Sequence, residues 1–182
     1  MYKKTIKSDF RSILKENNLT VYFNRYNHYT LIHGIDSSRI VSVELVCSTK
    51  IDLLLHGSHD NNFVDGIGHF IFTIPKWEEK INFYIFAFFN TEIQTIEYII
   101  VPDEELRKRY QRLNRLPVGS KKAELTLWLM SDNKVYDTNK ISMEGEWYWL
   151  SRDVDGRMAD GTQEDYTEYL NNWEGMVEAV FG

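Results

Sequence analysis

The stretch INFYIFAFF, residues 81–89, is the most apolar part of the sequence and decides the fold. It is too short to cross a bilayer, which takes about 20 residues, but it matches a strand that is buried on both faces. The stretch RIVSVELVC, residues 39–47, is β-branched and largely apolar, and it predicts a second central strand. We therefore expect a central β-sheet built around these two segments.

Segments on either side predict further strands and three helices. The expected strands are residues 19–23, 28–34, 69–74, 97–101, 123–130 and 146–150, and residues 51–55 fit either a strand or a helical turn. The expected helices begin near Ser8, run from 103 to 113, and follow the apolar spacing from Tyr166 to Val180. This order predicts an α+β fold, a mixed central β-sheet flanked by an N-terminal helix, a basic mid-chain helix and a C-terminal amphipathic helix.

Length and composition favour one domain. The chain has 182 residues, 43% of them hydrophobic, which suffices for a core without covalent staples. The single cysteine, Cys47, excludes an internal disulfide and is expected to be a buried apolar residue. A Gly-rich turn between strand and helix and a P-loop are both missing from the sequence, which argues against a nucleotide fold of either kind. The N-terminus has no apolar signal segment, so a cytoplasmic location without membrane attachment is expected.

Charge is distributed unevenly along the chain. The net charge is −6, yet residues 104–122 hold seven basic residues against two acidic ones, and residues 144–182 hold ten acidic residues against two basic ones. One interpretation is that the basic block binds nucleic-acid phosphates. Its residues would be Arg107, Lys108, Arg112, Arg115, Lys121 and Lys122. The other interpretation is two solvated faces that partly neutralise each other.

Two carboxylates near the second central strand could hold a hard cation. Asp36 precedes the strand and Glu44 lies within it, in VELVCST. Metal-dependent cleavage of phosphodiesters requires carboxylates that converge on Mg²⁺, with a lysine close by to orient water or stabilise charge. The same two residues have a plain structural interpretation, a turn residue and an exposed strand residue.

The succession of these segments resembles the PD-(D/E)XK nuclease-like family, the restriction-endonuclease-like enzymes. The resemblance covers about residues 8–112. It rests on a starting helix followed by HYTLIHG, IVSVELVCST, FYIFAFF and EYIIVPDEEL. The family places an aspartate on or just after one strand and Glu-x-Lys on the next. The resemblance implies a nuclease-like core at about residues 8–115, with residues 116–182 as a C-terminal extension of two strands and a helix within a single domain, 1–182.

This chain departs from the family pattern at the lysine. Val46 occupies that position, and Thr30 occupies the aspartate position if HYTLIHG is aligned with the family's strand. The resemblance then implies Asp36 and Glu44 as Mg²⁺ ligands, with Lys50 as a substitute lysine from beyond the strand. The expected function is action on, or binding of, nucleic acid, by a domain that is either a metal-dependent nuclease or a catalytically degenerate relative.

Two other segments contain potential metal ligands. His56, His59, Asp60, Asp65 and His69 fall within fourteen residues and fit either a transition-metal site or a surface loop with glycine turns. Residues 153–165, DVDGRMADGTQED, begin like a calcium loop but lose that pattern after Asp155. A loop rich in Asp and Gly is the alternative.

A different class of function also fits the sequence. The acidic C-terminal part contains Trp147, Tyr148, Trp149 and Trp173. Aromatic side chains among acidic ones are typical of surfaces that bind a basic protein. The alternative prediction is therefore a non-enzymatic interaction protein of the inhibitor or immunity type.

Overall fold

The computed structural model describes residues 2–25, 27–33, 36–48, 50–53, 66–74, 80–90, 93–112, 122–130, 133–137 and 164–181. Within these ranges the strands form two five-stranded sheets. Sheet A has the order β1 (Leu19–Arg25), β2 (His28–His33), β3 (Asp36–Cys47), β6 (Phe83–Asn90) and β7 (Thr95–Pro102). Sheet B has the order β10 (Glu164–Asp165), β9 (Val135–Asp137), β8 (Ala123–Met130), β5 (Gly66–Ile74) and β4 (Lys50–Leu53).

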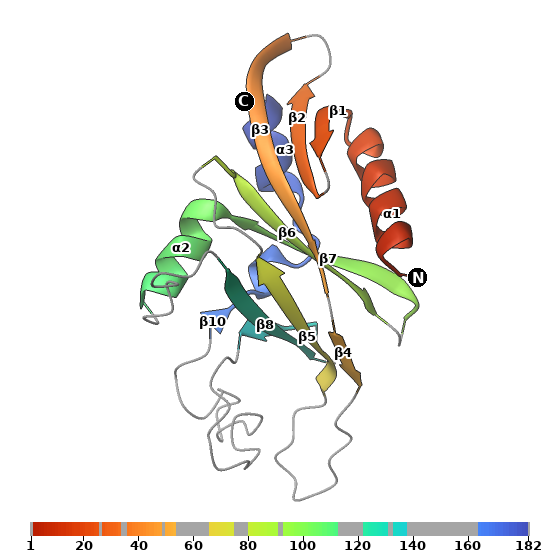
Figure 1. The fold of residues 1–182 in the computed structure, drawn as a ribbon, viewed down its shortest axis with the longest axis vertical. Coiled ribbons are helices and arrows are strands. Elements are labelled where there is room, and N and C mark those ends of the chain that lie inside the picture. The colour runs from red at the N-terminus through yellow and green to blue at the C-terminus, as the bar shows by residue number, and fades with distance from the viewer. Residues whose placement is uncertain are drawn as a thin grey trace, which may run out of the picture.

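Three α-helices accompany these sheets in the described ranges: α1 (Tyr2–Glu16), α2 (Asp103–Arg112) and α3 (Glu174–Phe181), with a short 3-10 helix η2 (Thr167–Tyr169) ahead of α3. Figure 1 shows α1 and α3 beside β1, β2 and β3, and α2 at the opposite side of the molecule from α1. The α+β fold class and the mixed central sheet with its three helices are therefore confirmed.

Sheet A is mixed because of one crossover. β1, β2 and β3 form an antiparallel meander, β3 and β6 are parallel, and β6 and β7 form an antiparallel pair. A parallel neighbour requires a connection that returns to the starting end of the sheet. Here the connection between β3 and β6 includes β4 and β5, so two strands of sheet B lie within a crossover of sheet A (Figure 1).

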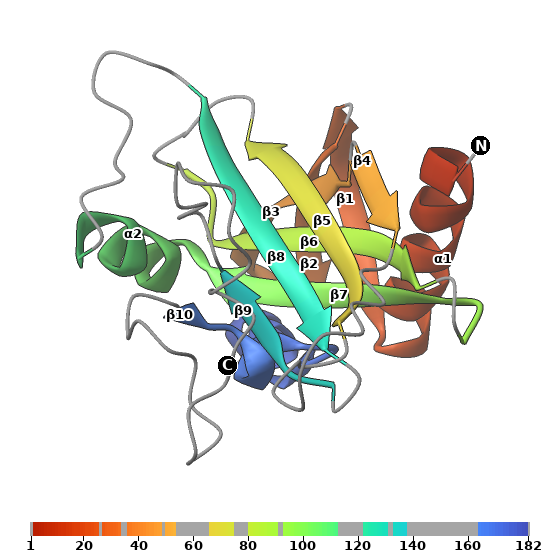
Figure 2. The same cartoon turned by 90° about the horizontal axis from the view of Figure 1, so that it is seen from below.

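The strand β6 has both faces covered, as its unbroken apolar sequence predicts. Phe83, Ile85 and Ala87 belong to the core under α1 and α3. Tyr84, Phe86 and Phe88 alternate with them and belong to the core between the two sheets. Figure 2 shows β5 and β8 crossing over β6 and β7. The described parts are thus layered as α1 with α3, sheet A and sheet B, with a separate apolar core on each side of sheet A, and α2 packs against the core between the sheets.

Four local predictions are corrected by the structure. The first helix begins at Tyr2 rather than near Ser8, and the last begins at Glu174 rather than at Tyr166. Residues 36–38, expected as a turn, begin β3, and Gly66–Gly68, expected in a loop, begin β5. The reason in each case is tertiary: neighbouring strands or packed side chains supply partners that a local pattern does not reveal. The expected strand 146–150 lies outside the described residues.

An aromatic cluster anchors α1 on sheet A. The ring of Phe10 is fully buried, and its centroid lies 5.0 Å from that of Tyr29, 6.3 Å from that of Tyr98 and 6.0 Å from that of Trp173. The hydroxyl of Tyr98 donates a hydrogen bond of 2.8 Å to the carboxylate of Asp9. Burial, together with this carboxylate, raises the pKa of Tyr98, so the hydroxyl keeps the proton that it donates. The same hydroxyl is 3.3 Å from the backbone carbonyl of Ile6, so the helix is held by apolar packing and by the polar contacts of Tyr98.

Asn171 fastens the C-terminal segment to β7. Its backbone has a φ of 52°, a left-handed conformation that asparagine tolerates better than most residues. The side-chain oxygen accepts a hydrogen bond of 2.9 Å from the backbone N–H of Tyr98, and the side-chain N–H donates to the buried carboxylate of Glu97. One side chain thus satisfies a strand N–H and a buried acid together.

Replacing Asn171 with alanine is expected to lower the free energy of unfolding by about 2 kcal/mol, because a strand N–H and a buried carboxylate both lose a partner. Asn171→Gly removes the same hydrogen bonds but adopts the positive φ without strain, so it separates the side-chain contribution from the backbone contribution. Urea denaturation of the two variants and the wild type measures the free energy of unfolding of each protein and so gives the side-chain and the backbone contributions. An alanine variant as stable as the wild type would contradict this role.

Candidate nucleic-acid interface

Glu44 lies in the middle of sheet A. It is paired with His28 of β2 on one side and with Tyr84 of β6 on the other. Its carboxylate is 3.7 Å from Nδ1 of His28, with the two side chains 15% and 29% exposed. Glu44 is therefore a half-buried carboxylate with a histidine neighbour, on the face of sheet A that also carries Tyr84.

The backbone of β3 places Asp36 and Glu44 at two separate positions along the strand. Both belong to β3, where Asp36 is opposite His33 and Glu44 is opposite His28. The five positions between these partners on β2 correspond to about 17 Å. Mg²⁺ holds its ligand oxygens at about 2.1 Å, and an aspartate and a glutamate together cannot span the rest. This backbone spacing argues against one Mg²⁺ shared by Asp36 and Glu44, and their assignment as its ligands stays a prediction.

The substitute lysine lies in the other sheet. Lys50 opens β4, where its backbone is paired with Ile71 of β5. In the described part of the chain, the acidic, histidine and cysteine side chains form no group of three or more that could hold a metal ion. Among the histidine-loop residues, His69 is in β5 and the other four lie outside the described residues, as do residues 153–163. The metal-site hypotheses for those two loops stay predictions.

Helix α2 neutralises most of its own charge. Arg107 is 2.6 Å from Asp103, Lys108 is 2.8 Å from Glu104, and Arg109 is 2.8 Å from Glu105. Each of these three basic residues thus has an acid one helical turn earlier, an arrangement that stabilises a helix. The contact with Glu104 raises the pKa of Lys108, and that with Lys108 lowers the pKa of Glu104.

The described part of the basic block therefore favours the interpretation of a solvated, self-neutralised face. Only one predicted phosphate ligand at its far end is placed, the exposed Lys122. The side chain of Arg112, together with Arg115 and Lys121, lies outside the described residues. Their predicted contacts with nucleic acid stay predictions.

Arg109 is a structural residue that sequence reasoning missed. It is 6% exposed, and its guanidinium donates to Glu105, to Glu168 at 3.1 Å and to the backbone carbonyl of Asp165. The same guanidinium lies 4.5 Å from the ring centroid of Tyr166 and 5.2 Å from that of Tyr169, within the range of cation–π attraction. Arg109 thus joins α2 to the C-terminal segment instead of facing a ligand. Its position in a row of charges gave no signal of burial.

Trp173 also has a structural place. Its ring packs against Phe10 and Tyr98, with a centroid distance of 5.1 Å to the latter. This half-buried ring packs against the core under α1 and α3, so part of its surface already serves the fold. Trp147, Tyr148 and Trp149 lie outside the described residues, and the alternative prediction of an acidic interaction surface stays a prediction.

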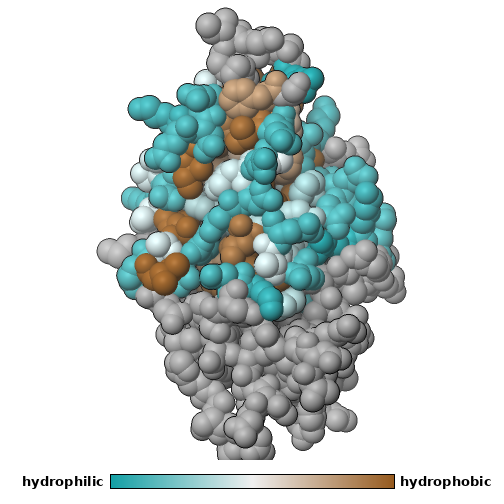
Figure 3. Space-filling view, turned by 180° about the vertical axis from the view of Figure 1, so that it is seen from behind, coloured by the Kyte–Doolittle hydropathy of each residue, from teal (hydrophilic) through white to brown (hydrophobic). Residues whose placement is uncertain are grey.

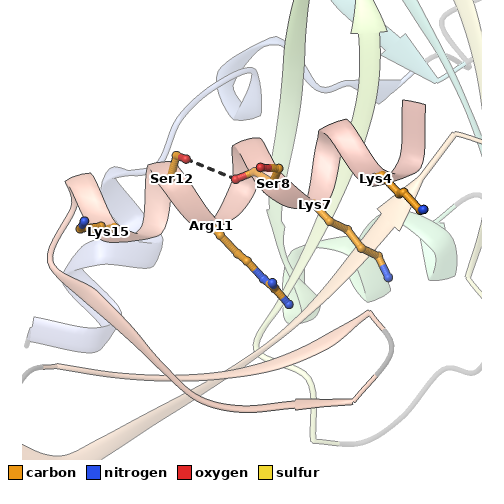
Figure 4. A pocket seen from close by; sticks show the side chains of 6 residues that line it. All are labelled: Lys4, Lys7, Ser8, Arg11, Ser12 and Lys15. Atoms are coloured by element: carbon orange, nitrogen blue, oxygen red, sulfur yellow. Dashed lines mark hydrogen bonds between the residues drawn. The ribbon is translucent and has the colours of Figure 1, made fainter. Parts of the chain in front are cut away.

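Among the residues that the structure describes, a row of cations lies along one side of α1. Lys4, Lys7, Arg11 and Lys15 recur every three or four residues and, with the hydroxyls of Ser8 and Ser12, line a shallow, open pocket of about 460 Å³. Figure 4 shows Lys7 and Arg11 extending to the same side of the helix from successive turns. Their spacing follows from Ile6, Phe10 and Leu14, which turn the opposite side of α1 into the core.

The basic side chains of α1 and α2 differ in whether they contact acidic side chains. Within the residues that the structure places, Lys4, Arg11 and Lys15 form no ion pair, whereas the described cations of α2 each contact an acid. Asp9, one of the two acids of α1, points inward to Tyr98. Viewed from behind, the described surface is mostly hydrophilic, with apolar atoms in small separate patches (Figure 3). The spacing of these lysines was visible in the sequence, but the expected helix start at Ser8 left Lys4 and Lys7 out.

No protein-family model matches the chain, and no curated protein or solved structure is a significant match. None of the described helices combines the length and the apolar character that a membrane crossing requires.

Proposed function

We propose that this chain binds nucleic acid through α1, and that it does so without cleaving it. The observation that carries the proposal is the row of Lys4, Lys7, Arg11 and Lys15 along one side of α1, of which Lys4, Arg11 and Lys15 have no ion-pair partner among the described residues. A cation without an acidic partner keeps its full attraction for phosphate, whereas a paired cation must first give up its partner.

The geometry of the predicted catalytic residues supports binding rather than hydrolysis. The partners of Asp36 and Glu44 on β2 lie five positions apart, about 17 Å, and a two-carboxylate clamp on Mg²⁺ needs both acids at one point. The lysine position of the resemblance is occupied by Val46, which is buried between the sheets and cannot carry charge. A degenerate nuclease-like domain that keeps affinity for nucleic acid but lacks the cation site agrees with both observations.

The spacing of the cations suits a phosphate backbone. Residues three and four apart on a helix lie about 5 to 6 Å apart along its axis, close to the separation of successive phosphates, which an extended arginine or lysine can adjust to. Ser8 and Ser12 add hydroxyl groups to the same side. Because the chain as a whole has a net charge of −6, binding depends on a local field, which salt screens over about 10 Å.

The variant Lys4→Ala/Arg11→Ala is expected to weaken nucleic-acid binding about tenfold at low salt, because it removes two unpaired cations from the proposed interface. The slope of log K against log salt concentration is expected to fall by up to about two units, one for each lost phosphate contact. Fluorescence anisotropy with labelled oligonucleotides over a series of salt concentrations measures both quantities.

The matched control is Lys108→Ala/Lys122→Ala, which changes the net charge by the same amount at residues outside α1. Lys108 is 58% exposed and paired with Glu104, and Lys122 is exposed, so this variant should fold. It is expected to keep wild-type affinity and salt slope. Equal losses in both variants would show that only net charge matters, and a wild type without salt-dependent binding would refute the proposed function.

A further inference from the structure

Tyr22 is a large aromatic side chain that the fold leaves in solvent. It lies in β1 and is 72% exposed, more than Ile40, Ile93 or Phe181, the other exposed large apolar side chains of the described residues. The pairing of β1 with β2 shifts between Val21 and Phe23, so Tyr22 is the extra residue of a β-bulge. Neither the core nor the ladder of β1 and β2 uses this ring.

The bulge also argues against one obvious use of β1. β1 is an edge strand of sheet A, and an edge can pair with a strand from another chain. A bulge interrupts the regular row of N–H and C=O groups that such pairing needs. At this point of β1, a ligand is therefore better bound by stacking on the face of the Tyr22 ring than by pairing with the backbone as an added strand.

Tyr22 lies level with the cations of α1. Asn17 and Asn18 connect α1 to β1, and the strand then runs back along the helix, with which it is in contact. Tyr22 is three residues into β1, about 10 Å from the turn. Arg11 and Lys7 are about 8 Å and 14 Å from the same turn along the helix. Figures 1 and 4 show the hairpin of β1 and β2 beside α1, on the side to which Lys7 and Arg11 extend.

We infer that the nucleic acid bound by α1 is single-stranded, and that a base stacks on Tyr22 while the neighbouring phosphates contact α1. This inference rests on the proposed function. An aromatic ring beside a row of cations is the combination that holds a single strand, because every base has a face that can stack and every nucleotide has a phosphate. A duplex keeps its base faces inside the stack, so it contacts the cations alone.

The test compares a labelled single-stranded oligothymidine with a duplex probe, using the wild-type chain, Tyr22→Ala and Tyr22→Phe. Tyr22→Ala is expected to weaken single-strand binding roughly tenfold, the loss typical of one stacked base. The salt slope should stay unchanged, because no cation is removed. Tyr22→Phe keeps the ring and should bind like the wild type, and the duplex affinity should be the same for all three proteins. Because Tyr22 is exposed, circular dichroism should show all three equally folded.

Three outcomes separate this inference from the proposed function. Loss of single-strand affinity in Tyr22→Ala alone supports the stacking role. Unchanged single-strand affinity in Tyr22→Ala, with binding still sensitive to Lys4→Ala/Arg11→Ala, overturns the inference and leaves the proposed function standing, and so does a wild-type preference for the duplex. A wild type that binds neither probe overturns both.

Discussion

Replacing Phe10 with alanine is expected to lower the free energy of unfolding by about 4 kcal/mol. The ring is fully buried and contacts Tyr29, Tyr98 and Trp173. These three rings come from β2, β7 and the segment before α3, so no single neighbour can move to fill the cavity. Aromatic pairs also stabilise beyond the area that they bury, by about 1 kcal/mol each.

Phe10→Leu is the control that keeps an apolar side chain at the site, and it is expected to cost less than half as much. Ser12→Ala tests a surface position of the same helix, where little change is expected. Urea denaturation followed by tryptophan fluorescence measures all three variants, since Trp173 reports on the cluster itself. A Phe10→Ala protein that loses less than about 1 kcal/mol would show that the cluster repacks, contrary to the expectation.

Arg109→Ala is expected to cost about 3 kcal/mol. The guanidinium is nearly buried and holds the carbonyl of Asp165, the carboxylates of Glu105 and Glu168, and the faces of Tyr166 and Tyr169. Burial alone would lower the pKa of Arg109, but its contacts with Glu105 and the two tyrosines raise it, so the group stays charged. The two carboxylates remain partly exposed after the change, which limits the penalty of leaving them unpaired.

The neighbouring Arg107 supplies a matched control on the same helix. It has a comparable ion pair, with Asp103, but its side chain is 31% exposed and so its loss should cost less than about 1 kcal/mol. Arg109→Lys keeps the charge but lacks the planar guanidinium. Its loss of stability should lie between those of Arg107→Ala and Arg109→Ala. Equal stability of Arg107→Ala and Arg109→Ala would mean that burial and stacking contribute nothing at Arg109.

The sequence predicts the centre of the fold better than its periphery. β6 and β3 were expected as central strands because uninterrupted apolar residues suit a strand that is covered on both faces. The division into two sheets was not expected, because it arises where the chain passes from β3 into β4 and leaves sheet A. Local patterns describe the strands but carry no information on which strand pairs with which.

The helix boundaries show the same limit. The turn before Phe10 contains only Ile6 as a core residue, so helical periodicity is weak there, and packing on sheet A extends the helix to Tyr2. From Tyr166 to Trp173 the apolar spacing is helical, but contacts of Arg109 and Asn171 hold the segment in another conformation. Tertiary contacts decide the structure at both places.

The candidate site depended on distances that the sequence does not contain. Asp36 and Glu44 were paired because a turn between two strands would have brought them together, but one strand carries both. The basic row of α1 could have been recognised from its spacing, had the helix been extended to include Lys4 and Lys7. Paired and unpaired cations look alike in a sequence, and the contacts with acids on α2 distinguish them.

The contact between Phe10 and Trp173 determines when the core under α1 can be completed during synthesis. The first of these rings is near one end of the chain and the second near the other, yet they share one core. During synthesis α1 leaves the ribosome before the segment around Trp173, so its apolar side has no complete cover until that segment follows. Until then Ile6, Phe10 and Leu14 present an uncovered apolar surface in the nascent chain, and a segment translated more than 150 residues later covers it.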